Sequence, residues 1–95
     1  MTLYVFWAKD DSPLQKLETT AMVSALTVAG HAHQLVEKSS SDVETLKLVA
    51  RHKIITTPSI VLTDETDEVV YRCRELPKAK RLLRILTVIQ DRTDG

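Results

Sequence analysis

The chain has 95 residues, of which 43% are hydrophobic and 27% charged, a composition typical of one globular domain and unlike that of a disordered chain. Thirteen basic residues balance thirteen acidic ones, so no net charge attracts nucleic acid or an anionic membrane. The single cysteine, Cys73, excludes a disulfide or a cysteine zinc site within one chain, and it fits a reducing compartment.

The sequence contains no convincing signal for secretion or membrane insertion. Residues 1–6 lack the basic head and small-residue cleavage site of a signal peptide. Residues 19–36 carry no formal charge, but their threonines, histidines and Gly30 make them too polar for a membrane span. We therefore expect a cytoplasmic protein that does not bind membranes.

The first third of the chain predicts a strand, a helix and a second strand. Residues 3–8 are an apolar and aromatic run, typical of a strand buried on both faces. Asp11 or Ser12 is placed to cap the following helix, and Pro13 suits its first turn. Gly30 ends this helix, and residues 31–37 predict a more polar strand. The expected buried face of the helix is Leu14, Leu17, Ala21, Met22, Ala25, Leu26 and Ala29.

The middle of the chain predicts a second helix and then a hairpin. Ser41 and Glu44 match the S-x-x-E capping box, which predicts where this helix begins. Residues 59–63 predict a strand, 64–67 a polar turn and 68–74 the second strand of the hairpin. The expected buried stripe of the helix is Val43, Leu46, Val49 and Ala50.

The last helix is predicted to begin at Pro77, and residues 91–95 are expected to form a frayed tail. The resulting order β-α-β-α-β-β-α predicts a single α/β domain over residues 1–95. Its four-stranded mixed sheet would combine a parallel crossover with an antiparallel hairpin, with helices on both faces.

This order and two local motifs resemble the thioredoxin-like superfamily in its minimal form. Phe6-Trp7-Ala8 followed by Asp11-Ser12-Pro13-Leu14 is similar to the thioredoxin stretch F-W-A-x-x-C-G-P-C. Thr57-Pro58-Ser59 is similar to the loop that carries the family's cis proline. The resemblance covers nearly the whole chain.

The departures from the family pattern bear on function. Asp11 and Leu14 stand where redox-active members carry cysteines, and Val5 stands where they place a buried carboxylate. A carboxylate and a leucine cannot attack a disulfide or resolve the product, so the resemblance implies a redox-inactive member. Arg74 stands where thioredoxins usually have a glycine beside the substrate groove, which favours an acidic ligand.

We therefore predict a protein-binding or regulatory module without a catalytic residue, cofactor or metal. A protein or peptide partner is expected, and the small core of so short a chain also favours a homo-oligomer. Asp11 and Ser12 could instead serve to cap the helix, and Trp7 could instead pack against the sheet. The predicted binding groove consists of Trp7, Asp11, Ser12, Pro13, Thr57, Pro58 and Arg74.

Two alternative functions stay open. Circadian-clock regulators related to KaiB also lack the cysteine pair, and the stretches L-Y-V at 3–5 and I-T-T-P at 55–58 are compatible with them. The other alternative is a monothiol or glutathione-linked enzyme that uses Cys73 or Ser12. No base stands next to Ser12, and strand alternation directs Arg72 and Arg74 away from the Cys73 thiol.

Two further clusters carry no predicted site. His31 and His33 are two residues apart on the second predicted strand, but a third metal ligand is not evident. The basic residues near the C-terminus have no interleaved aromatic side chains, so they favour a solvated helix face over a nucleic-acid platform. They are Arg72, Arg74, Lys78, Lys80, Arg81 and Arg84.

Overall fold

The computed structural model describes the backbone of residues 1–94 and the side chains of residues 1–89. The elements follow the β-α-β-α-β-β-α order that the sequence predicts. They are β1 (Thr2–Trp7), α1 (Pro13–Val28), β2 (Gln34–Glu37), α2 (Val43–Arg51), β3 (Ser59–Thr63), β4 (Val69–Cys73) and α3 (Ala79–Asp94). No helix within the described residues is long and apolar enough to cross a bilayer.

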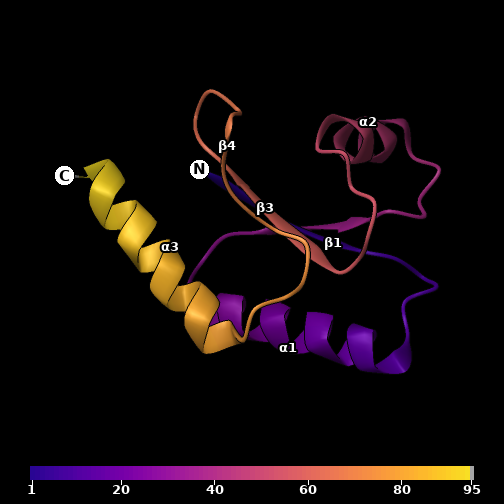
Figure 1. Cartoon of the computed structure of the whole chain (residues 1–95), viewed down its shortest axis with the longest axis horizontal. Coiled ribbons are helices and arrows are strands. Elements are labelled where there is room, and N and C mark those ends of the chain that lie inside the picture. The colour runs from indigo at the N-terminus through magenta and orange to yellow at the C-terminus, as the bar shows by residue number, and fades with distance from the viewer. Residues whose placement is uncertain (95) are drawn as a thin grey trace.

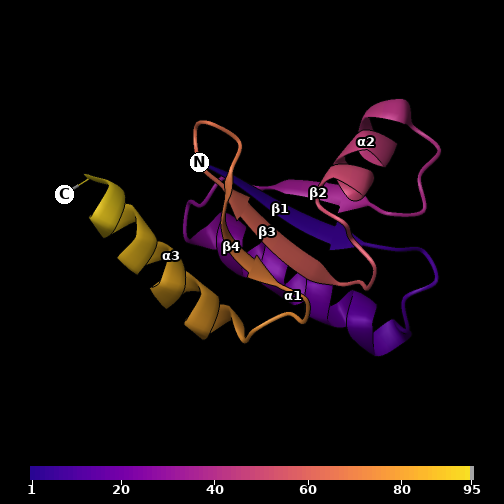
Figure 2. The same ribbon diagram turned by 45° about the horizontal axis from the view of Figure 1, so that its top comes forward.

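The four strands form one mixed sheet in the order β2-β1-β3-β4. β1 pairs with β2 in parallel and with β3 antiparallel, and β3 pairs antiparallel with β4. Helices α1 and α3 lie on one side of this sheet and α2 lies on the other, while β2 and β4 form its two edges (Figures 1 and 2). The predicted fold class is therefore confirmed.

Side chains alternate across β1 and so contribute to two separate hydrophobic clusters. Leu3 and Val5 belong to the cluster that includes Met22 and Leu26 of α1 and Leu82 and Leu86 of α3. The cluster beneath α2 is smaller and consists of Tyr4, Phe6, Val36, Ile54 and Val61. Because α2 has only 9 residues, it covers less of the sheet than the two longer helices together.

The predicted buried face of α1 is wrong at four of its seven positions. Leu14 is 65% exposed, and Leu17, Ala21 and Ala29 are also exposed. Met22 and Leu26 of the predicted face are buried, and so is Thr19, which the prediction omitted. A hydrogen bond from Gln15 Nε2 to the carbonyl of Thr57, 3.5 Å long, turns the Gln15 side of the first turn towards the loop before β3.

The predicted start and buried stripe of α2 also need correction. Asp42, not Ser41, caps the helix, because its Oδ2 accepts a 3.1 Å hydrogen bond from the backbone N–H of Thr45. Leu48 and Val49 pack on the smaller cluster, whereas three residues of the predicted stripe, Val43, Leu46 and Ala50, are exposed. His52 at the end of the helix is buried, with its ring against Tyr4 and Phe6 of β1.

Several boundaries differ from those predicted. β2 begins at Gln34, so His31 and His33 precede the strand. α3 begins at Ala79 rather than Pro77, because the carbonyl of Lys78 accepts the first helical hydrogen bonds. The helix continues through residues 91–94, where a frayed tail was expected, and residue 95 lies outside the described residues.

Candidate functional site

A carboxylate joins the start of α1 to the loop before β3. Asp11 is only 9% exposed. Its Oδ2 accepts a 2.9 Å hydrogen bond from the N–H of Ala8, and its Oδ1 accepts one of 2.5 Å from the hydroxyl of Thr57. The peptide bond between Thr57 and Pro58 is cis. Asp11 therefore connects the end of β1, the helix start and the proline loop.

Ser12 and Gln15 form a reciprocal capping box at the start of α1. The Ser12 hydroxyl accepts from the Gln15 N–H at 3.1 Å, and Gln15 Oε1 accepts from the Ser12 N–H at 2.8 Å. Pro13 occupies the first helical position, where its missing N–H needs no partner. Of the two residues that the sequence offered as helix cap, Ser12 is the one that performs this role.

An open groove of about 710 Å³ lies beside the proline loop. Of the seven predicted groove residues, the described lining includes Thr57, Pro58 and Arg74. Asp11 contacts the groove through Thr57, while Trp7, Ser12 and Pro13 lie outside the lining. The lining residues that sequence reasoning missed are Gln15, Glu18, Thr56, Glu75 and Leu76. The only sequence signal for them was their nearness to residues already predicted.

Trp7 occupies the last position of β1, opposite Glu37 in the register with β2. Its carbonyl accepts a 2.7 Å hydrogen bond from the N–H of Lys38, and its side chain is half-buried. Phe6, the residue before Trp7, pairs with Ser59, which directly follows Pro58. Trp7 therefore lies near the proline loop but is not among the residues that line the groove.

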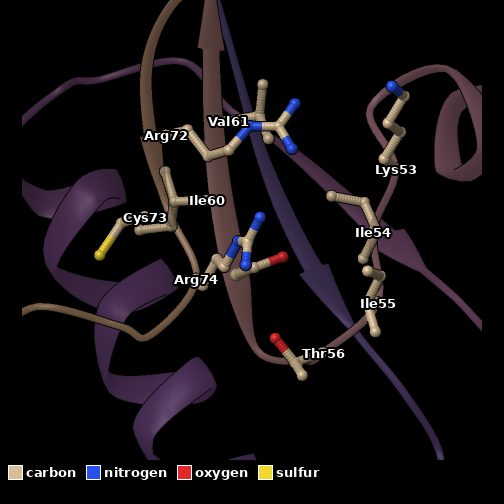
Figure 3. Close-up of a pocket in the computed structure, with 10 residues that line it drawn as sticks. Lys53, Ile54, Ile55, Thr56, Ile60, Val61, Arg72, Cys73 and Arg74 are labelled. Atoms are coloured by element: carbon tan, nitrogen blue, oxygen red, sulfur yellow. The ribbon is translucent and has the colours of Figure 1, made fainter.

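Cys73 is half-buried on β4, opposite Ile60 of the larger cluster. Its Sγ lies 2.5 Å from the carbonyl of Glu75, with the thiol as donor. Burial and, after it, the neighbouring Cys73 raise the pKa of the Tyr71 phenol. Figure 3 shows the sulfur directed away from Arg72 and Arg74, as strand alternation predicts.

His52 is a buried ionisable group at the C-terminal end of α2. It is 2% exposed, and its ring lies 5.6 Å from that of Tyr4 and 6.3 Å from that of Phe6, centroid to centroid. Burial is the main cause that lowers the pKa of His52, and the charges of Arg51 and Arg72 lower it further, while Asp67 opposes them. Nε2 has no partner among the described residues. The environment therefore favours the neutral imidazole.

The structure offers no cluster of metal ligands in the part of the chain that it describes. His33 Nδ1 lies 3.0 Å from the carbonyl of His31, in the segment before β2. This local contact accounts for one ring nitrogen of His33.

These observations define a thioredoxin-fold protein: a mixed sheet between helices, with a cis-proline loop facing the start of the first helix. No protein-family model matches the sequence, and no curated protein sequence matches it. The fold is nevertheless that of solved thioredoxins. Thioredoxin 1 from the thermophilic bacterium Thermosipho africanus aligns over 100% of both chains with a TM-score of 0.74 and 10% identity.

Two further solved structures show the same likeness. A thioredoxin-fold protein from Helicobacter pylori aligns over 95% of this chain and 68% of its own, with a TM-score of 0.68 and 20% identity. Thioredoxin-2 of the malaria parasite's protein secretion machinery aligns over 90% of this chain and 80% of its own, with a TM-score of 0.66 and 16% identity. At these sequence identities the comparisons establish the fold but not the function.

Proposed function

We propose that this chain is a thioredoxin-fold binding protein that does not perform dithiol–disulfide exchange. Its role would be to hold an extended protein segment in the groove beside Pro58. The observation that carries the proposal is the Thr57–Asp11 hydrogen bond. At the position where the family resemblance expects a nucleophilic thiol, this chain has the Asp11 carboxylate, which accepts hydrogen bonds from Ala8 and Thr57.

The chemistry of exchange needs a thiolate that attacks a disulfide and a second thiol that resolves the mixed disulfide. Asp11 supplies neither, and its oxygens already accept from Ala8 and Thr57. Leu14 is exposed at the surface of α1 and carries no reactive group. With Cys73 as the single cysteine, one chain cannot close an internal disulfide.

The backbone beside the groove supports binding of an extended segment. The N–H of Thr57 has no hydrogen-bond acceptor among the described residues, and its carbonyl accepts only the long bond from Gln15. A partner strand satisfies such groups by adding main-chain hydrogen bonds, while pockets for its side chains supply specificity. The groove volume of about 710 Å³ suits a few residues of a peptide.

The monothiol alternative has weaker support. The Cys73 thiol donates to the carbonyl of Glu75 and lies on the face of β4 that packs towards α1 and α3. Arg72 and Arg74 lie on the other face, so neither is placed to stabilise a thiolate. Ser12 is engaged in the capping box, which leaves it without an activating base.

The redox part of the proposal is tested with the purified chain and a peptide disulfide, with dithiothreitol as the recycling reductant. We expect a rate equal to that of dithiothreitol alone, while an authentic thioredoxin accelerates it. A rate above the background that is lost in Cys73→Ser would contradict this part of the proposal and favour a monothiol activity.

The binding part is tested by affinity purification with mass spectrometry, followed by calorimetry with the purified partner. Glu18 lines the groove, so Glu18→Trp is expected to fill part of it and weaken binding at least about tenfold. Glu44→Trp is the matched control, because Glu44 is exposed on α2, on the other side of the sheet. Equal affinity of the wild type and Glu18→Trp would exclude the groove as the binding surface.

A further inference from the structure

A second, smaller pocket lies between β4 and the segment 53–56 that follows α2 (Figure 3). Its volume is about 80 Å³. The walls include the apolar side chains of Ile54, Ile55 and Val61. Arg72 of β4 and Arg74, which directly follows β4, also line the pocket, and their side chains lie on the side of the sheet that faces the segment with Ile54 and Ile55 (Figure 3). The lining of the pocket therefore combines apolar and cationic side chains.

The positive charges at this pocket lack matching acidic groups. Arg72 Nη1 donates a 2.6 Å hydrogen bond to the carbonyl of His52, which fixes the guanidinium and leaves its other N–H groups without a partner among the described residues. Arg74 and Lys53 form no hydrogen bond or ion pair with a described side chain. None of the described lining residues is acidic.

A buried hydroxyl in the same lining points independently to a ligand. Ser59 is 4% exposed, and its Oγ has no hydrogen-bond partner among the described residues. In β3 it lies two residues before Val61, so strand alternation places both side chains on the α2 side of the sheet. Buried hydroxyls in folded proteins are nearly always paired, so the Ser59 hydroxyl is a donor that an oxygen outside the protein, such as that of a ligand, would satisfy.

We infer that this pocket binds the carboxylate of a glutamate side chain on the partner segment. The inference rests on the proposed function, because Thr56 and Arg74 line both the pocket and the groove. The arginine N–H groups match the two oxygens of a carboxylate, and the Ser59 hydroxyl adds a further donor. The apolar walls suit the two methylene groups of glutamate, which an inorganic anion lacks.

The experiment is an NMR titration of the full chain, labelled with ¹⁵N, with N-acetyl-glutamate N-methylamide. Its neutral isostere, N-acetyl-glutamine N-methylamide, is the matched probe. We expect the glutamate probe to shift the amide signals of residues 53–56, 59–61 and 72–74, and the glutamine probe to leave them unchanged. Equal shifts with the two probes, or shifts spread over the surface, would overturn the inference.

Inorganic phosphate separates a carboxylate site from a general anion site. Displacement of the bound glutamate probe by phosphate supports a shared cationic pocket. Binding of phosphate without binding of the glutamate probe would overturn the carboxylate assignment.

Two variants locate the interaction. Arg74→Gln removes a charged donor, and we expect it to lower the affinity for the glutamate probe about tenfold. Ser59→Ala removes the unpaired hydroxyl and is expected to lower the affinity by about threefold to tenfold. Arg84→Gln makes the same charge change on the exposed surface of α3, across the sheet, and is expected to change the affinity less than about twofold. An effect of Arg84→Gln equal to that of Arg74→Gln would contradict a local site.

The two proposals fail in different ways. If the glutamate probe binds as expected but the purified partner binds Glu18→Trp normally, the anion pocket stands and the groove function falls. If the partner needs the groove but tolerates Arg74→Gln and replacement of each of its own glutamates by glutamine, the groove function stands and this inference falls.

Discussion

The Thr57 hydroxyl donates a 2.5 Å hydrogen bond to Oδ1 of Asp11, and this contact joins two loops that lie 46 residues apart in sequence. The same carboxylate accepts from Ala8 through Oδ2. Both carboxylate oxygens therefore have protein donors before any ligand arrives. In this chain the Asp11 carboxylate therefore holds the start of α1 against the proline loop through hydrogen bonds.

This contact predicts a measurable loss of stability when either partner is changed. Asp11→Asn keeps the shape but offers one acceptor oxygen to two donors, so one hydrogen bond is lost. Thr57→Val leaves the buried Oδ1 without its donor. We expect each variant to lower the free energy of unfolding by about 1–3 kcal/mol in urea denaturation.

A double-mutant cycle separates this contact from other effects of the two substitutions. The coupling energy between positions 11 and 57 is expected to be at least about 0.5 kcal/mol. Asp10→Asn is the control, because Asp10 is exposed and forms no hydrogen bond with a described residue; we expect a change within about 0.5 kcal/mol. Strictly additive losses at positions 11 and 57 would show that the two side chains do not stabilise each other.

The start of α2 gives a second prediction, because the sequence pattern and the structure disagree about its cap. Asp42 Oδ2 accepts from both the N–H and the hydroxyl of Thr45, at 3.1 and 3.2 Å. Asp42→Ala should therefore lower the free energy of unfolding by about 0.5–2 kcal/mol. Ser41→Ala should change it by less than about 0.5 kcal/mol. A larger loss for Ser41→Ala would restore the capping box that the sequence predicted.

Features with local signals were predicted well. The bounds of β3 match the prediction, because an apolar run between Pro58 and a polar turn leaves little choice of ends. β4 is one residue shorter at each end than predicted, since pairing with β3 decides where its ladder stops. The position of the proline loop opposite the start of α1 was predicted from the family resemblance together with the parallel crossover.

Features that depend on tertiary contacts were not predictable in the same way. Apolar residues occupy more than one face of α1, so helical periodicity fitted a face that the structure leaves exposed at Leu14 and Leu17. Arg72 and Arg74 were grouped with the cations of α3 because they are close in sequence. Strand alternation places these two arginines on the opposite side of the sheet, beside Lys53.

The buried His52 predicts that stability depends on pH. Burial, together with Arg51 and Arg72, lowers the pKa of the folded imidazole below its ordinary value of 6.5, while Asp67 only partly opposes this shift. The unfolded chain therefore binds more protons at this residue than the folded protein as the pH falls through 6.5, and the free energy of unfolding decreases. Above about pH 6.5 the imidazole is neutral in both states, so it causes no loss of stability there.

The measurement is urea denaturation of the wild type and His52→Phe between about pH 7.5 and 5. Phenylalanine keeps an aromatic ring against Tyr4 and Phe6 but cannot bind a proton, so the variant should lose less stability on acidification. The backbone carbonyl of residue 52 remains available to Arg72. An identical decline of the two proteins with pH would show that His52 is not the source of the acid sensitivity.

The unpaired hydroxyl of Ser59 gives the last prediction, which concerns the protein without a ligand. Its Oγ is buried without a hydrogen-bond partner among the described residues, a situation that disfavours the folded state. Ser59→Ala removes this penalty, so we expect the free energy of unfolding to rise by up to about 1 kcal/mol in urea denaturation. Thr63→Val is a suitable comparison, because the buried Thr63 hydroxyl donates to the carbonyl of Thr2 at 3.4 Å and its loss should not stabilise the fold. A stability loss in Ser59→Ala that matches that in Thr63→Val would mean that the Ser59 hydroxyl already has an acceptor, and the case for a ligand oxygen at this position would lose its main support.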